Sequence, residues 1–264
     1  MTPDIHDYIR PGKRAHLVGI GGVSMSPLAE VLHGAGVEIT GSDMHESATV
    51  AHLRSLGIPV VIGHLPESVQ GAGCVIRTAA VHDDNPEIAA ARAAGIPVFE
   101  RAQAWGAIMK HYENALCVAG THGKTTTTSM CTHIFLAAQR DPTVMIGGVL
   151  PALGAGHRVG KGDTIILESC EYCNSFLSFF PTVAVILNVD ADHLDFFKDL
   201  EDVKHSFLRF CPAGARARLC GGRRGRRQHH GRPEGPAPPH AHLRSGARGH
   251  PRGQPHLGQG PAHL

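Results

Sequence analysis

The residues of this sequence with the clearest chemical meaning form a short run rich in glycine and threonine. The run consists of Gly120, Thr121, His122, Gly123, Lys124, Thr125 and Thr126. Glycines allow backbone N–H groups to converge on phosphate oxygens, and the dipole of a following helix favours negative charge. In such a loop Lys124 would contact the β- and γ-phosphates of a nucleotide, and the Thr125 hydroxyl would coordinate Mg²⁺. Because an apolar segment, residues 115–119, precedes the run, we interpret it as a phosphate-binding loop rather than an ordinary glycine turn, although only two residues separate its glycines.

A second glycine-rich turn, at residues 19–24, follows another apolar segment. Its candidate ligand-binding residues are Gly19, Gly21, Gly22 and Ser24. Ser24 stands where the dinucleotide-binding fingerprint has its third glycine, so this motif is weaker than the first. Asp43 follows the next apolar segment, at a position where nucleotide-binding sheets often contact a ribose or base. The turn alone is as compatible with strand–helix packing as with ligand binding.

Carboxylates and one imidazole follow two further apolar segments. Glu168 and Glu171 come directly after residues 164–167. Residues 183–187 are followed by Asp190, Asp192, His193 and Asp195. Parallel strands end at the same edge of a sheet, where α/β proteins bind their ligands, so both groups should meet there. Such ligands beside a phosphate loop suit Mg²⁺ ions that accompany ATP, although single acids in these places are often only helix caps or surface charge.

The elements that must position these residues are alternating strands and helices. From residue 15 to about residue 95, short apolar runs alternate with helix-like segments, the pattern of parallel βα units on a covered sheet. We expect the first helix to begin with Ser26 as its cap and Pro27 at its first position. The sequence therefore predicts an α/β protein. Residues 1–111 would form an N-terminal Rossmann-like domain with a parallel sheet, and residues 112–211 a partial phosphate-loop α/β domain that binds ATP.

The composition, with 42% hydrophobic and 18% charged residues, is that of a globular chain with one large or two modest domains. The N-terminus lacks the pattern of a signal peptide, and no stretch approaches the roughly 20 apolar residues that a membrane helix needs. Seven scattered cysteines indicate reduced thiols, and Cys170 and Cys173 lack the second pair that a structural zinc site needs. We therefore expect a cytoplasmic protein with no membrane partner.

Residues 212–264 differ from the rest in composition. They contain ten arginines, no lysine and a single acid, Glu234, with few apolar residues. Such a segment cannot bury a core, so it is predicted to be a disordered basic tail. An arginine-rich arm could bind RNA, but the tail has neither lysine nor aromatic residues, and we expect no nucleic-acid partner.

The glycine motifs and the two acidic groups, within residues 19–26, 118–128, 168–179 and 188–195, together resemble the Mur ligases. The resemblance extends to about residue 210. It implies an ATP-dependent ligase of peptidoglycan precursor synthesis, which phosphorylates the carboxylate of UDP-N-acetylmuramate and joins the acyl phosphate to L-alanine. ATP and Mg²⁺ would be its cofactors, and UDP-N-acetylmuramate, L-alanine and ATP its partners. The oligomeric state stays open.

The resemblance also assigns roles to residues. The catalytic residues would be Lys124, Glu171 and His193, with Lys124 stabilising the charge on the transferred phosphoryl group. Thr125 and Glu171 would bind one Mg²⁺, and His193 a second. The first domain would contact the UDP-sugar through Gly19, Gly21, Gly22, Ser24, Asp43, His64 and Thr78. Ala79 stands where the family often has a second hydroxyl residue beside Thr78, so that contact is the least typical.

The family's longer members continue into the rest of the ATP domain and a third domain. Codons can be chosen for residues 228–235, 239–246 and 256–263 so that reading one base later yields family-like strings, of which NTMDALKG is the first. We therefore hypothesise a shift of reading frame near residue 211 and expect impaired ligase activity. Two other functions stay open: a related ligase that adds a peptide to UDP-N-acetylmuramate, and a non-catalytic fragment that binds the UDP-sugar.

Overall fold

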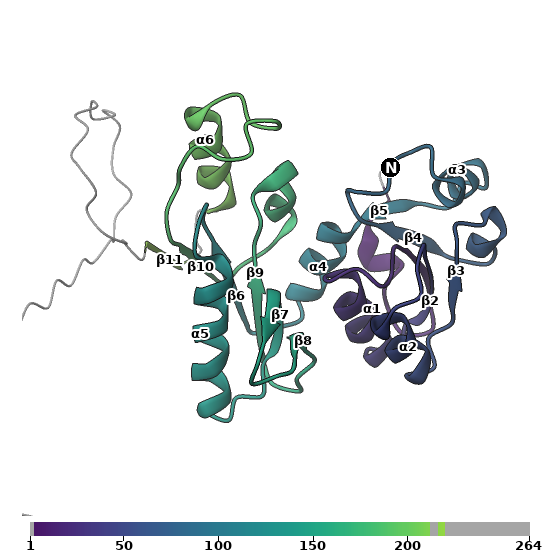
Figure 1. Cartoon of the computed structure of the whole chain (residues 1–264), viewed down its shortest axis with the longest axis horizontal. Coiled ribbons are helices and arrows are strands. Elements are labelled where there is room, and N and C mark those ends of the chain that lie inside the picture. Colours follow the sequence, from purple (N-terminus) through teal and green to yellow (C-terminus); the bar gives the residue numbers. More distant parts are fainter. Residues whose placement is uncertain (1–2, 212–215, 220–264) are drawn as a thin grey trace, which may run out of the picture. The chain divides into compact units, whose positions relative to one another are not determined.

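The structure is a computed structural model that describes residues 3–211 and 216–219 of the chain (Figure 1). All of them fall within one compact unit, residues 1–223. Two separate sheets organise the unit. Their strand orders are β3-β2-β1-β4-β5 and β11-β10-β6-β9-β7-β8, so the predicted α/β fold class is confirmed.

The first sheet is built from parallel strands only. Its strands are β1 (Arg14–Val18), β2 (Glu38–Asp43), β3 (Val60–Ile62), β4 (Cys74–Arg77) and β5 (Val98–Glu100). The helices of this region are η1 (Ile5–Asp7), α1 (Met25–Gly34), α2 (Ala48–Ser55), η2 (Pro66–Val69), α3 (Pro86–Ala93) and α4 (Arg101–Met109). The strand order places β1 at the centre, so the loops that follow β1, β2 and β4 emerge side by side at one edge.

Local capping chemistry explains where the helices of the first region begin. Asn85 caps α3 because its side-chain oxygen accepts hydrogen bonds from the amides of Glu87 and Ile88. The prediction that Ser26 caps α1 is wrong, since the helix already begins at Met25 and Ser26 is buried inside it. The reason lies in the preceding turn, where the Gly22 carbonyl accepts the amides of both Met25 and Ser26.

The second sheet is mixed. Its strands are β6 (Asn114–Ala119), β7 (Thr143–Leu150), β8 (Ala155–Arg158), β9 (Thr164–Glu168), β10 (Val183–Ile186) and β11 (Arg216–Leu219). Only β8 runs antiparallel, against β7. The helices are α5 (Lys124–Ala137), η3 (Tyr172–Ser178) and α6 (Leu200–Phe210), and α5 packs against β6, β7 and β9. In this sheet β6, which leads into the predicted phosphate loop, lies between β9 and β10.

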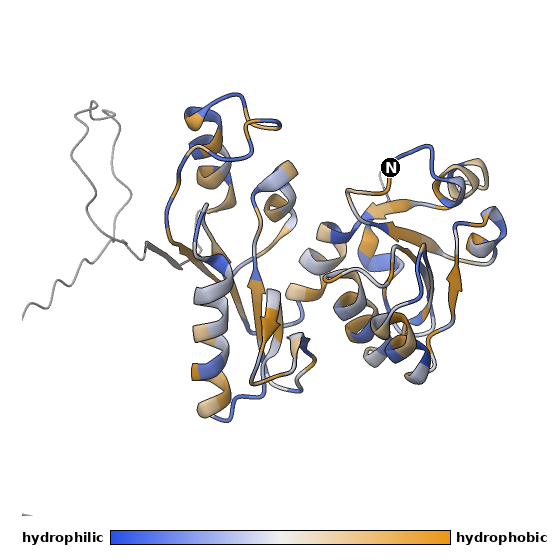
Figure 2. Cartoon of the chain, viewed as in Figure 1, coloured by the Kyte–Doolittle hydropathy of each residue, from blue (hydrophilic) through white to orange (hydrophobic). Residues whose placement is uncertain are grey.

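In the strands of both sheets apolar residues do not alternate with polar ones, and the hydrophobic core therefore lies on both faces of each sheet. Ile165, Ile166 and Leu167 are all fully buried, because both faces of β9 are covered. Figure 2 shows the orange of apolar residues on strands of both sheets, such as β3 and β7. Aromatic packing secures α6, since the ring of Phe210 stacks on Phe176 with centroids 4.5 Å apart.

The predicted disordered tail, residues 212–264, lies outside the described residues except at β11. There the prediction is wrong, because Arg216–Leu219 pair in parallel with β10. A strand at the edge of a sheet is held by backbone hydrogen bonds, and these can form whatever the amino-acid composition of the segment. The hypothesised frame shift also concerns residues that the structure does not describe. No helix among the described residues is long and apolar enough to cross a membrane.

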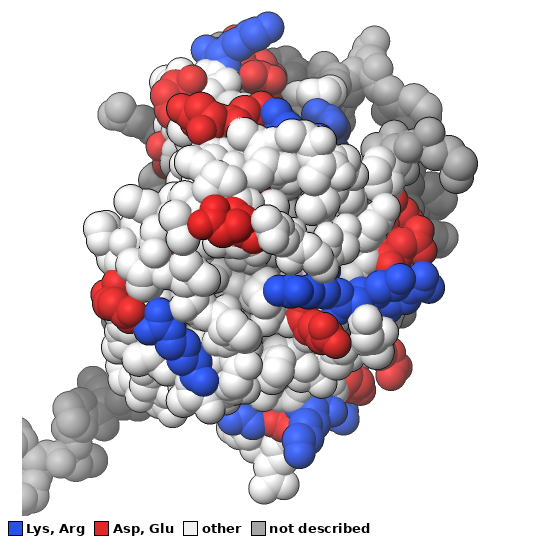
Figure 3. Space-filling view, turned by 90° about the vertical axis from the view of Figure 1, so that its right-hand side faces the viewer, with Lys and Arg blue, Asp and Glu red and all other residues white. Residues whose placement is uncertain are grey.

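The charged surface of the first region is mixed in sign. On the face shown in Figure 3, acidic and basic side chains are interspersed among uncharged ones.

Candidate active site

The phosphate loop joins β6 to α5 in the predicted strand–loop–helix order. Gly123 precedes α5 with a left-handed φ of 85°, and Gly120 has a φ of 139°. A Cβ on Gly120 would lie 3.0 Å from the Cβ of Leu187 and 3.1 Å from the Asn188 carbonyl oxygen. Both glycines are therefore required by backbone conformation, and Gly120 also by the close approach of the chain after β10.

Lys124 is folded back over this loop. Its ammonium nitrogen lies 2.6 Å from the Gly120 carbonyl and 3.2 Å from the Thr121 carbonyl. It also lies 3.0 Å from the carboxylate of Glu171, which is only 1% exposed. The structure thus brings together two of the three predicted catalytic residues, and it places the ammonium where phosphate oxygens could replace the loop carbonyls. His122 and Thr126 are exposed at the same loop.

The acid nearest to Thr125 is Glu168 rather than Glu171. The Thr125 hydroxyl donates to Glu168 Oε1 at 2.9 Å, and the Gly147 amide donates to Glu168 Oε2 at 2.6 Å. Glu168 ends β9, the strand beside β6, whereas Glu171 lies beyond the following turn and pairs with Lys124. The resemblance paired Thr125 with Glu171, but in the structure Glu168 contacts the threonine and Glu171 contacts Lys124.

Magnesium ligation remains a prediction. Among the described residues no group of three or more His, Cys, Asp or Glu side chains is arranged to hold a metal ion. The oxygens of Thr125 and Glu168 nevertheless fit Mg²⁺, which usually keeps several waters and takes its other ligands from phosphates. His193, with a left-handed φ of 53°, packs its ring 4.8 Å from that of Tyr172, and no acid–imidazole cluster with Thr125 is formed.

Asn188, which sequence reasoning did not single out, holds the phosphate loop in place. Its side-chain oxygen accepts the His122 amide at 2.8 Å, and its side-chain nitrogen donates to the His122 carbonyl at 2.9 Å. Its backbone carbonyl accepts the Thr121 amide at 3.1 Å. Two residues further on, the Asp190 amide donates to the Thr121 hydroxyl at 2.8 Å. The segment after β10 therefore holds the phosphate loop by hydrogen bonds on one side of the loop, and Glu168 and Glu171 lie on its other side.

Replacing Asn188 with alanine should weaken ATP binding about tenfold, because the loop loses the two side-chain hydrogen bonds that hold it before the nucleotide arrives. Isothermal titration of ATP with Mg²⁺ measures the change. Asn114→Ala, at the exposed start of β6, is the matched control and should bind as the unchanged chain does. Equal affinities for Asn188→Ala and the unchanged chain would show that the loop is ordered without this side chain.

The predicted sugar-nucleotide residues gather at the corresponding edge of the first sheet. Gly19, with a φ of 77°, starts the turn after β1, and its Cβ position is 3.9 Å from Thr78, which follows β4. The Gly21 amide donates to Asp43 Oδ2 at 2.8 Å, and a Cβ on Gly21 would lie 2.9 Å from that oxygen. Asp43 therefore ties the glycine turn to the end of β2 with one carboxylate oxygen. Gly22 lies in the same turn, its amide bonded to the Gly19 carbonyl.

His64 belongs to a buried polar network that the sequence did not reveal. Glu87, fully buried, accepts hydrogen bonds from Ser42 at 2.6 Å, from His64 Nδ1 at 2.8 Å and from His16 at 3.3 Å. Burial by itself raises the pKa of Glu87, but the hydrogen bonds from His16 and Ser42, the charge of His16 and the hydrogen bond from His64 outweigh it and hold the pKa below its ordinary value. Since Nδ1 donates to Glu87, the outer nitrogen of His64 is left for a ligand.

Glu87→Gln should lower the free energy of unfolding by about 1 to 3 kcal/mol near neutral pH, because the buried network loses its charge-assisted hydrogen bonds. The folded-state pKa is lowered, so this contribution is complete above the unfolded value, about 4.3, and is lost as the pH falls through the folded-state value. Denaturant melts at a series of pH values should therefore show a steeper acid loss for the unchanged chain than for Glu87→Gln. Glu67→Gln, at an exposed position, should keep the steep acid loss. Parallel curves for the unchanged chain and Glu87→Gln would contradict the prediction.

Two family models match this chain, one over each of its two α/β regions. A model described as "Mur ligase family, catalytic domain" matches residues 14–113, and one for the Mur ligase middle domain matches residues 118–215. The UDP-N-acetylmuramate–L-alanine ligase of Agathobacter rectalis is 50% identical over 205 residues, which are 77% of this chain and 44% of that ligase. The ligase of the same name from Acetivibrio thermocellus is 49% identical over 75% of this chain and 42% of its own length. The chain thus spans less than half the length of these relatives.

Solved structures agree with this assignment. The crystal structure of the UDP-N-acetylmuramate–alanine ligase of Thermotoga maritima is 33% identical, with a TM-score of 0.68 over 75% of this chain and 46% of that one. The UDP-N-acetylmuramate:L-alanyl-γ-D-glutamyl-meso-diaminopimelate ligase of Neisseria meningitides is 27% identical, with a TM-score of 0.67 over 75% of this chain and 67% of that one. The chain belongs to the Mur ligase family, and residues 14–113 and 118–215 are the parts that match its catalytic and middle domains.

Proposed function

We propose that this chain derives from an ATP-dependent ligase that joins L-alanine to UDP-N-acetylmuramate in peptidoglycan precursor synthesis. The observation that carries the proposal is the phosphate loop, with Lys124 over it, Glu168 and Glu171 on one side and Asn188 on the other. This loop lies in a chain that is 50% identical to a ligase of that name. The work would be done in the cytoplasm, where cell-wall precursors and ATP are both present.

The proposed reaction has two steps. A carboxylate oxygen of UDP-N-acetylmuramate attacks the γ-phosphorus of ATP, which forms an acyl phosphate and releases ADP. The uncharged amine of alanine then attacks the acyl carbon, and phosphate leaves as the amide forms and the amine loses its proton. Lys124 and the amides of the loop would stabilise the negative charge that gathers on the transferred phosphoryl group.

Two parts of the site support binding of Mg²⁺ with the nucleotide. Thr125 and Glu168 already hold two hard oxygens 2.9 Å apart at the mouth of the loop. Glu171 would become a third donor once phosphate oxygens compete for its partner Lys124. The ion would supply charge neutralisation for phosphoryl transfer. The role of His193 as a ligand of a second ion stays with the proposal and is its least supported part.

Binding and turnover should be measured separately. We expect the 264-residue chain to bind ATP and UDP-N-acetylmuramate in isothermal titration. Alanine-dependent release of ADP is measured apart from binding, because the matched residues make up less than half the length of the related ligases. Failure to bind either nucleotide would refute the proposal, and rapid turnover would refute the expected impairment.

Two other functions are distinguished by the same assays. The likeness to the Neisseria ligase, whose name includes a tripeptide, favours testing that peptide in place of alanine. ADP release with the tripeptide and not with alanine would identify the peptide-adding reaction. Tight binding of UDP-N-acetylmuramate with no ATP binding would instead indicate a non-catalytic fragment that binds the UDP-sugar.

A further inference from the structure

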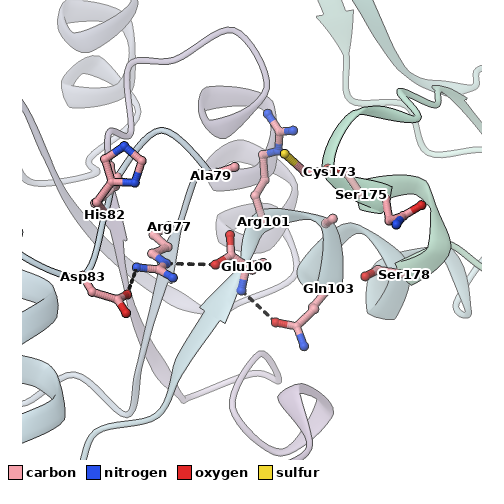
Figure 4. Close-up of a pocket in the computed structure, with 13 residues that line it drawn as sticks. Arg77, Ala79, His82, Asp83, Glu100, Arg101, Gln103, Cys173, Ser175 and Ser178 are labelled. Carbon is pink, nitrogen blue, oxygen red and sulfur yellow. Dashed lines mark hydrogen bonds and ion pairs between the residues drawn. The ribbon is translucent and has the colours of Figure 1, made fainter. Parts of the chain in front are cut away.

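A pocket of about 590 Å³ lies between the end of the first sheet and the segment that follows β9. Its lining includes Arg77, Glu100 and Arg101 on one side and Cys173, Ser175 and Ser178 on the other. Figure 4 shows these residues, which come from the end of the first sheet and from the segment that follows β9. The volume suits a sugar-sized ligand, since small-molecule sites typically measure about 300 to 1,000 Å³.

The charges in the lining are balanced except at Arg101. Arg77 bonds both acids of the lining, Glu100 at 2.9 Å and Asp83 at 2.6 Å. Asp83 also accepts from Arg92 at 2.8 Å. Arg101, by contrast, forms no ion pair within 4.0 Å among the residues that the structure describes. Of the two arginines in the lining, Arg101 is therefore the one that pairs with no acid in the described part of the chain and that a negative group of a ligand could pair with.

The guanidinium of Arg101 is held in a defined position. It donates to the Ser24 hydroxyl, and the Ser24 carbonyl accepts from the Trp105 indole at 3.2 Å. Figure 4 shows the side chain extending away from Arg77, Glu100 and Asp83, toward Cys173. Burial lowers the pKa of Arg101, and the charges of Cys170 and Glu100 oppose that shift, so a bound anion would relieve a desolvated cation.

Cys170 is influenced both by this cation and by the lysine of the phosphate loop. Burial raises the pKa of the Cys170 thiol, and the nearby charges of Lys124 and Arg101 both act against that rise. Cys170 precedes Glu171, whose carboxylate is 3.0 Å from Lys124, and Cys173 lines the pocket. The segment that lines the pocket beside Arg101 therefore also carries the acid that pairs with Lys124.

We propose that Arg101 binds the carboxylate of the acidic sugar in UDP-N-acetylmuramate and so orients the group that is to be phosphorylated. The inference rests on the proposed function. A planar guanidinium binds a carboxylate with two parallel hydrogen bonds, which sets its direction as well as its affinity. Arg101 carries one unneutralised positive charge, which matches the single charge of a carboxylate better than the two charges of a diphosphate. The glycine turn after β1 is available for the diphosphate.

The test compares UDP-N-acetylmuramate with UDP-N-acetylglucosamine, which has the same nucleotide and ring but lacks the carboxylate. In isothermal titrations of the full chain, Arg101→Met should weaken binding of the muramate compound roughly 10- to 100-fold and leave binding of the glucosamine compound unchanged. Arg101→Lys should recover part of the loss, because it restores the charge without the planar fork. Arg209→Met, at an exposed position on α6, is the control and should change neither affinity.

Each remaining outcome bears on the proposal. Equal losses for both compounds would overturn it, because the guanidinium would then contact the shared diphosphate. An unchanged affinity of Arg101→Met for the muramate compound would also overturn it, while the proposed function would stand. If the unchanged chain bound neither compound, the proposed substrate and this inference would fail together. Should Arg101→Met not fold, Arg101→Lys and Ser24→Ala provide the comparison, the latter keeping the charge but removing its tether.

Discussion

Replacing Lys124 with methionine should lower the free energy of unfolding by about 3 kcal/mol, even with no nucleotide present. The physical reason is Glu171, which is 1% exposed and whose carboxylate lies 3.0 Å from the ammonium of Lys124. Without that cation the acid must stay charged and buried or take up a proton, and either change costs free energy. The same substitution should also abolish measurable ATP binding, because the loop loses the ammonium that lies over its carbonyls, where phosphate oxygens would bind.

Denaturant unfolding of three variants tests this prediction. The double variant Lys124→Met, Glu171→Gln should regain much of the lost stability, because no unpaired charge remains, but it should not regain ATP binding. Lys204→Met breaks an ion pair with exposed Glu201 on α6 and should change stability by less than about 0.5 kcal/mol. If Lys124→Met unfolded at the same denaturant concentration as the unchanged chain, the pair would be shown not to contribute.

Gly106→Ala should destabilise the chain by more than about 3 kcal/mol, although alanine normally stabilises a helix relative to glycine by about 0.5 to 1 kcal/mol. Gly106 is buried in α4, and a Cβ at this position would overlap the backbone carbonyl of Ser178 and lie 3.3 Å from the Phe180 ring. The obstacle is backbone, so no side-chain rotation can relieve it. The substitution must separate α4 from the segment that carries the pocket lining.

The fluorescence of Trp105, the single tryptophan of the chain and 1% exposed, reports on this contact during unfolding. Gly34→Ala is the matched control, since Gly34 ends α1 and its Cβ would meet nothing within 4 Å. The control should be neutral or slightly stabilising. A Gly106→Ala variant as stable as Gly34→Ala would show that α4 and residues near Ser178 do not pack as closely as the structure has them.

Much of the fold was predictable because its signals are local. The apolar run before the phosphate loop, the glycines within it and the helix after it are contiguous, and they predicted the β6–loop–α5 unit correctly. The start of α3 is likewise set by adjacent residues, with Asn85 as its cap and Pro86 in its first turn. The edge at which Glu168 and Asn188 emerge followed from parallel-strand geometry, and the strand pairing confirms it. The functional roles assigned to the site residues remain predictions.

Other features could not be predicted because they depend on partners far away in the chain. The hydrogen bond between Asn188 and His122 joins residues that are 66 positions apart in the sequence. The bond between Glu87 and His16 spans 71 positions, and the bond between Arg101 and Ser24 spans 77. No local period or spacing encodes such pairs. The expected cap at Ser26 was wrong for a different, local reason, because the Gly22 carbonyl already accepts the amides of Met25 and Ser26 and the helix begins at Met25.

The amino-acid sequence by itself determined the order of strands and helices, the phosphate loop and the family, since these depend on short-range backbone preferences and on contiguous motifs. The tertiary structure decided which acid meets Thr125, which residue pins the loop, and that one arginine in a sugar-sized pocket has no acidic partner among the described residues. Such choices depend on how side chains from separate strands meet at a sheet edge. Only the packing of the folded chain determines the distances between these side chains. Those distances decide which charged groups stay unpaired and available to a ligand.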